Sequence, residues 1–101
     1  ALMSLDNVKE QMTQMLGELE ALNATVKFDC KEDGIIFLDA TQEPAQLSEE
    51  DDFADCTIRI STKNLEKLIA GKLDPMLAYT MGKLKIKGSM GTALKLTNLL
   101  N

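Results

Sequence analysis

Residues 71–88 read GKLDPMLAYTMGKLKIKG and contain the clearest local structure signals of this 101-residue chain. The pair Asp74-Pro75 predicts the start of a helix, because an aspartate side chain accepts hydrogen bonds from free amides and proline loses none at the first helical position. Gly82 predicts the end of that short helix. Over positions 83–87, lysines alternate with leucine and isoleucine, which predicts a strand with one apolar and one cationic face.

Three further helices are expected around this stretch. Apolar residues recur at three- and four-residue intervals over positions 5–22, as they do on one face of a single amphipathic helix. Residues 62–70 show similar spacing and are followed by Gly71, which indicates a helix end. A last helix is expected after Gly91, where leucines dominate the apolar positions.

Strands are expected where apolar and polar residues alternate. This pattern covers residues 24–30 and 56–61, and a short apolar run at 35–38 predicts another strand. An Asp-Gly pair precedes that run and is a hairpin signal, so the first two strands should be antiparallel neighbours. Residues 42–47 contain a proline and predict at most an edge strand.

The composition fits one globular domain over residues 1–101. Apolar residues make up 45% of the chain and charged residues 27%, with only two prolines, which excludes a disordered or fibrous class. No apolar run approaches the roughly 18 residues that a membrane-spanning helix needs. The net charge of -5 argues against general nucleic-acid binding, which requires a basic face.

Candidate catalytic and metal-binding residues are scarce. The chain has no histidine, which removes the commonest general base and the commonest transition-metal ligand. Cys30 and Cys56 lie on the apolar side of their strand patterns, so we expect buried free thiols that pack rather than react. The acidic segment 49–55 lacks the spaced ligands and central glycine of a calcium loop. We therefore expect no metal site and no cofactor. Lysine-based or paired-carboxylate chemistry stays open, because it needs only a few residues brought together by folding.

The six methionines are an unusual feature of the apolar residues. Several occupy patterned apolar positions, among them Met76, Met81 and Met90. Their flexible thioethers would suit a cavity that adapts to floppy ligands, but they would equally fill an irregular core. The spacing alone favours the core.

GKLDP at positions 71–75, followed by GKLKIKG at 82–88, resembles the signature of the sterol carrier protein type two family. The likeness reaches back through residues 54–58 and the leading amphipathic helix, so it covers nearly the whole chain. The resemblance implies an α/β (α+β) fold with a five-stranded, curved, mainly antiparallel sheet. Helices would pack on one face of this sheet and enclose an apolar tunnel.

The resemblance also implies a function without catalysis. The family binds and carries hydrophobic lipids, such as fatty acids, fatty acyl-CoA, phospholipids or sterols, and a tunnel lined by apolar side chains would give loose selectivity. By position, the residues expected to contact lipid are Phe28, Phe37, Ile58, Met76, Leu77, Met81, Met90, Leu94 and Leu99.

The basic C-terminal part offers a second candidate surface. From Thr62 to Asn101 there are seven lysines against two acidic residues. Lys83, Lys85 and Lys87 are expected to meet an anionic head group or an anionic membrane surface. Charged side chains on an edge strand also serve to block aggregation, and this alternative stays open.

Two other functions remain possible for such a domain. The first alternative is an interaction module that presents a lipid or isoprenoid intermediate to partner enzymes. The second is a domain excised from a larger enzyme. The first residues show no secretory signal pattern, and Leu99-Leu100-Asn101 lacks a peroxisomal address of the Ser-Lys-Leu type. A cytoplasmic location is therefore expected.

Overall fold

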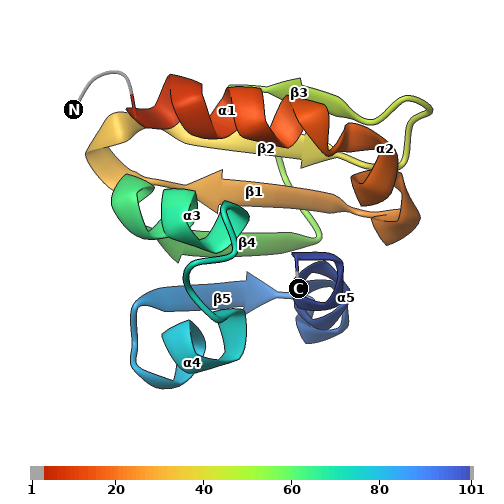
Figure 1. Ribbon diagram of the computed structural model, residues 1–101. Coiled ribbons are helices and arrows are strands. Elements are labelled where there is room, and N and C mark those ends of the chain that lie inside the picture. The colour runs from red at the N-terminus through yellow and green to blue at the C-terminus, as the bar shows by residue number, and fades with distance from the viewer. Residues whose placement is uncertain (1–3, 101) are drawn as a thin grey trace.

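The computed structural model describes residues 4–100, which form a five-stranded sheet with helices on one face (Figure 1). The strands lie in the order β3-β2-β1-β4-β5. Only β1 and β4 pair in parallel within these residues, so the sheet is mainly antiparallel, as the family resemblance implies. The strand bounds are β1 Thr25–Asp29, β2 Ile35–Asp39, β3 Gln46–Ser48, β4 Cys56–Ile60 and β5 Leu84–Gly88.

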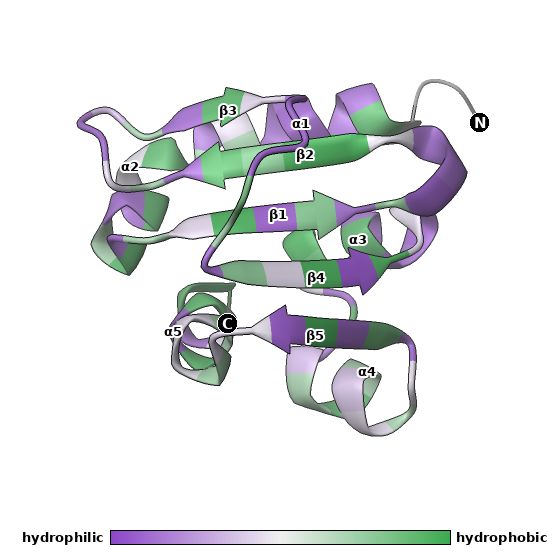
Figure 2. Ribbon diagram, turned by 180° about the vertical axis from the view of Figure 1, so that it is seen from behind, coloured by the Kyte–Doolittle hydropathy of each residue, from purple (hydrophilic) through white to green (hydrophobic). Residues whose placement is uncertain are grey.

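The helices and the connection between β3 and β4 lie on opposite faces of the sheet. The helix bounds are α1 Ser4–Gln14, α2 Leu16–Leu19, α3 Thr62–Ile69, α4 Pro75–Thr80 and α5 Met90–Leu100, with short 3-10 turns η1 Glu20–Leu22 and η2 Lys31–Asp33. In Figure 1, α1 and α3 lie side by side in front of the sheet. In Figure 2, the chain between β3 and β4 crosses the other face. None of the helices described within residues 4–100 is both long and apolar enough to cross a membrane.

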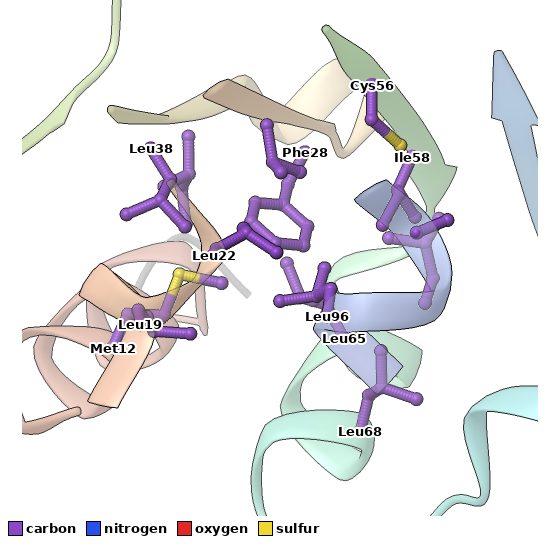
Figure 3. Close-up of a cluster of buried hydrophobic side chains, with 14 of the residues drawn as sticks. Met12, Leu19, Leu22, Phe28, Leu38, Cys56, Ile58, Leu65, Leu68 and Leu96 are labelled. Atoms are coloured by element: carbon purple, nitrogen blue, oxygen red, sulfur yellow. The ribbon is translucent and has the colours of Figure 1, made fainter. Parts of the chain in front are cut away.

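The alternating strand pattern determines which side chains form the core. In β1, Val26 and Phe28 are buried beneath the helices, while the neighbouring positions point to the other face. Figure 3 shows Phe28 pointing into a cluster that includes Leu22, Ile58 and Leu96. Side chains from η1, β1, β4 and α5 therefore share one continuous core.

The single helix expected over residues 5–22 is wrong, because the structure divides it into α1, α2 and η1. The backbone amide of Met15 donates to the Met12 carbonyl at 2.9 Å, a bond between residues three apart that tightens the turn. Gly17 follows, and glycine is a poor helix former at an interior position. Asn23 then ends the segment in the left-handed conformation at φ 50°, which asparagine tolerates.

The expected edge strand is confirmed, but its position is shifted. The weak signal at 42–47 appears as β3 at residues 46–48, and β3 lies at one edge of the sheet. The residues around Pro44 form a turn instead of a strand, since proline supplies no amide to a strand ladder.

The helix signals of residues 71–88 are confirmed. Asp74 accepts a hydrogen bond from the Leu77 amide at 3.2 Å, and Pro75 occupies the first turn of α4. Gly71 and Gly82 adopt φ values of 76° and 75°, which a residue with a side chain rarely adopts. Both turns that flank α4 are thus encoded locally.

Candidate functional site

An apolar groove lies between α4, α5 and the strands β4 and β5. Its volume is about 510 Å³ when the solvent-filled open mouth is included. The residues that line it are Ile58, Leu68, Pro75, Met76, Tyr79, Leu84, Ile86, Met90, Ala93, Leu94, Leu96, Thr97 and Leu100.

The lining of the groove is almost entirely apolar. Tyr79 and Thr97 are the polar side chains among the lining residues, and none of these residues is charged. The Thr97 hydroxyl already donates to the Leu94 carbonyl at 2.8 Å. The groove therefore offers contact to hydrocarbon and few fixed polar partners to an occupant.

A small residue and one close backbone approach make room for the groove. Ala93 of α5 is buried and lines the groove, where its short side chain leaves space that a larger residue would fill. Gly88, at φ 92°, ends β5 so close to β4 that a Cβ atom would clash with the Asp55 carbonyl oxygen. The Ser89 amide donates to that same oxygen at 2.8 Å, which fixes the point where α5 begins.

The mouth of the groove exposes large apolar side chains. Met76 is 52% exposed, Met90 46% and Leu94 51%. These fractions differ from those of an enclosed tunnel, whose lining side chains would be covered on all sides. The structure instead shows a groove that is open to solvent between α4 and α5.

Four of the nine side chains expected to contact lipid lie in this groove: Ile58, Met76, Met90 and Leu94. They come from β4, α4 and α5, and the fold brings them together although they are far apart in the sequence. Their contact with lipid stays a prediction.

The other five expected side chains do not line the groove. Phe28 is 1% exposed and fills the core (Figure 3), while Phe37 lies on the opposite face of the sheet from the buried residues of β2. Leu77 and Met81 are exposed on other faces of α4 and its end, and Leu99 packs partly against the core. Alternation and apolar character identify these residues, but helix phase and sheet face decide where they point.

The spacing within the two helices would have identified several missed residues. On α4, Tyr79 lies three residues after Met76 and shares its face, whereas Leu77 does not. On α5, Met90 is followed at helical spacing by Ala93, Leu94, Thr97 and Leu100. Strand alternation likewise places Leu84 and Ile86 beside Ile58, and the missed residues are Leu68, Pro75, Tyr79, Leu84, Ile86, Ala93, Leu96, Thr97 and Leu100.

The three candidate lysines lie away from the groove. Lys85 and Lys87 alternate with Leu84 and Ile86, so they lie on the opposite face of β5 from the groove. Lys83 is exposed in the turn between α4 and β5. None of the three lines the apolar groove.

Both cysteines are buried, and they form no disulfide. Cys30 is 3% exposed, and Cys56 is fully covered. Burial raises the pKa of both thiols above the ordinary value, so the reactive thiolate is disfavoured. Within residues 4–100, no cluster of three cysteine, aspartate or glutamate side chains is arranged to hold a metal ion.

A model of the SCP-2 sterol transfer family matches residues 5–101. The chain belongs to this family. It is 37% identical over 87 residues to hydroxysteroid dehydrogenase-like protein 2 of Bos taurus, which covers 82% of this chain and 21% of that protein. It is 51% identical over 53 residues to sterol carrier protein 2 of Oryctolagus cuniculus, which covers 52% of this chain and 10% of that protein. The matched parts thus span about a fifth and a tenth of these relatives.

Solved structures share the SCP-2 fold. The solution structure of the sterol carrier protein domain 2 of Helicoverpa armigera has a TM-score of 0.71 at 28% identity and covers 94% of this chain and 83% of its own. The sterol carrier protein 2 of Aedes aegypti, solved in complex with palmitate, has a TM-score of 0.68 at 15% identity, covering 89% and 94% of the two chains. The α+β fold with its five-stranded mixed sheet is therefore that of the family.

Proposed function

We propose that this SCP-2 domain binds and carries hydrophobic lipids in the apolar groove. The observation that supports the proposal is the lining itself, in which uncharged side chains from α3, α4, α5, β4 and β5 surround one open hollow. When a long acyl chain or a sterol-like molecule enters the groove, its apolar surface would leave water and contact these side chains.

The energetics favour loose selectivity. Each methylene group removed from water contributes about 0.8 kcal/mol, so a long chain is held without a fixed polar partner. Met76 and Met90 would adjust to ligands of different width, because methionine side chains are flexible. Fatty acids, fatty acyl-CoA, phospholipids and sterol-like lipids are the expected classes, and the palmitate complex of the Aedes aegypti relative supports an acyl chain as one occupant.

The open mouth gives a route for loading. Met76, Met90 and Leu94 are each about half exposed, so a lipid can reach the groove without unfolding of the core. We expect the domain to work as a binding module without catalysis of its own, in the cytoplasm.

Native mass spectrometry of protein purified without detergent, followed by lipid extraction, tests this function. We expect a co-purifying acyl or sterol-like species, or saturable binding of a fluorescent fatty acid by the bare protein. A bare protein that binds no fluorescent fatty acid would contradict the proposal.

A second candidate function follows from the length of the relatives. The matched part of the Bos taurus relative is 21% of that protein, which shows that a domain of this kind also occurs inside a larger chain. In that case the groove would present a lipid or an isoprenoid intermediate to partner enzymes rather than move it between membranes. A stable complex that co-purifies with the domain, together with no lipid transfer between vesicles, would favour this second function.

Contact with anionic membranes is a separate part of the proposal. Lys83, Lys85 and Lys87 are exposed and would meet such a surface. Reversal of all three charges should slow lipid transfer from anionic vesicles and leave transfer from neutral vesicles unchanged. A charge-reversed variant that transfers lipid from anionic vesicles as fast as the parent would leave only the aggregation-blocking role.

A further inference from the structure

We propose that a second hollow, on the opposite face of the sheet from the apolar groove, binds a phosphate group. This cationic hollow is lined by Lys31, Arg59, Gly82, Lys83, Leu84 and Lys85, and its volume is about 580 Å³ with its open mouth included. The ends of β1 and β4 and the beginning of β5 lie at the same end of the sheet (Figure 2), which brings together the segments that carry the lining residues.

The charge of the hollow is concentrated, and no ion pair among the described residues neutralises its cations. Four of its six lining residues are cationic and none is acidic, although the whole chain carries a net charge of -5. The ion pairs within residues 4–100 involve Lys9 and Lys27, and neither pair includes a residue of the hollow. Asp29 lies beside Arg59 in the strand register, and its Oδ1 accepts a hydrogen bond from the Lys31 amide at 2.9 Å.

The placement of Arg59 does not suit a role in blocking aggregation. That role belongs to edge strands, but β4 is an interior strand between β1 and β5. Arg59 is also directly opposite Lys85 in the antiparallel register, and like charges in that arrangement destabilise a sheet. Solubility alone would not require Arg59 and Lys85 to face each other across two neighbouring strands.

The backbone conformation of Lys31 is a second unfavourable feature of the cationic hollow. Lys31 adopts φ 59°, in the left-handed region that glycine and asparagine occupy far more readily than lysine. Two locally destabilising features therefore converge on one hollow, and such features cluster at functional sites.

The chemistry of the hollow selects the class of ligand. A carboxylate carries one charge and is satisfied by a single arginine or lysine, whereas four cations match a group with up to two negative charges. The planar guanidinium of Arg59 can donate two parallel hydrogen bonds to phosphate oxygens, and the lysines add mobile ammonium groups. A phosphate group fits this arrangement, either on a phospholipid head group or on a soluble phosphorylated compound.

Amide chemical-shift titration with inorganic phosphate, at constant ionic strength, tests the site directly. We expect saturable shifts at Lys31, Arg59 and Lys85, and an increase of about tenfold in the dissociation constant for Arg59→Gln. Lys67→Gln is the matched control, because it removes one charge from an exposed residue of α3 on the helix-covered face. The control should bind phosphate as the parent does. Shifts that do not saturate, or equal weakening in both variants, would overturn the proposal.

Thermal unfolding separates a binding role from a structural one. Without phosphate, Arg59→Gln should melt at the same or a higher temperature than the parent, because it removes the like-charge contact with Lys85. At the same phosphate concentration, the melting temperature of the parent should rise more than that of the variant, because the variant binds about tenfold more weakly. A variant that melts lower than the parent and gains as much from phosphate would contradict the assignment.

Vesicle binding distinguishes the two sources of phosphate. Binding to phosphatidylcholine vesicles that is increased by phosphatidic acid and lost in Arg59→Gln assigns the hollow to a lipid head group. Phosphate binding in solution without that increase assigns it to a soluble phosphorylated compound. Because Arg59 does not line the apolar groove, fatty-acid binding by the same variant reports independently on the proposed carrier function.

Discussion

The two parts of the sheet are covered to very different extents. On α1 and η1, large side chains such as Met12 and Leu22 are each 1% exposed and pack in the core. On α4 and α5, the residues Met76 and Leu94 are about half exposed, and the groove remains between these helices and the strands β4 and β5. The part covered by α1 and η1 therefore stabilises the fold, while the part covered by α4 and α5 leaves apolar contacts available to a ligand.

The largest expected effect comes from the filled part. Phe28→Ala should reduce the free energy of unfolding by about 3–5 kcal/mol, because it opens a cavity in the core beside Ile58 and Leu96. Urea unfolding measures this loss. Phe37→Ala is the control, since Phe37 is only partly buried on the other face, and it should cost clearly less. Equal losses would show that Phe28 does not anchor the core.

Gly88→Ala should have the next largest effect on stability. The Cβ atom of alanine at this position would clash with the Asp55 carbonyl oxygen, and the residue would have to adopt φ 92°. We therefore expect the free energy of unfolding to fall by about 1–3 kcal/mol. The control is Gly17→Ala, where the Cβ meets nothing within 4 Å and φ is not in the left-handed region, and it should stabilise by about 0.5–1 kcal/mol. Chemical unfolding of both variants checks the opposite signs, and a neutral Gly88→Ala would contradict this interpretation of the β5–α5 junction.

Lipid affinity separates the two faces of the α4–α5 region. Leu94→Gln should weaken binding of a fluorescent fatty acid by about fivefold to tenfold, since it removes an apolar contact from the groove. Leu77→Gln is closely matched, because Leu77 and Leu94 are both 51% exposed but only Leu94 lines the groove. Affinity should be unchanged in Leu77→Gln. A larger loss at Leu77 than at Leu94 would favour the initial sequence prediction for Leu77.

The smallest effect is expected at the cysteines. Burial raises the pKa of the thiols of Cys30 and Cys56, which keeps them protonated at neutral pH. A maleimide should therefore label neither residue in the folded protein and both residues after unfolding, as read by mass spectrometry. Because the folded-state pKa is raised, stability should be constant at neutral pH and should fall as the pH rises above about 9, where the unfolded thiols ionise. Rapid labelling of the folded protein would indicate an opening of the core.

The sequence predicts most elements because their signals are local. Asp74 and Pro75 start α4, alternation identifies β1, β4 and β5, and a short apolar run after an Asp-Gly pair identifies β2. The break at Met15 was missed because the apolar stripe continues across it, and only the backbone bond to Met12 reveals it. Local signals therefore define the elements better than their exact ends.

The candidate site could be predicted only in part. Ile58 and Leu94 were identified as apolar, but apolar character does not say whether a side chain enters the core, as Phe28 does, or lines the groove. Helix phase would have separated Tyr79 from Leu77, since the residue three positions after Met76 shares its face. Cationic residues from separate segments, such as Lys31 and Arg59, come together only in the folded sheet.

The most direct test of the account is an isotope-filtered nuclear Overhauser experiment with palmitate bound to labelled protein. We expect contacts between the methylene protons of palmitate and the side chains of Met76, Met90 and Leu94, which surround the open groove. Contacts confined to Leu77, Met81 or Phe37, or no saturable contacts at all, would contradict the claim that this groove is the lipid site.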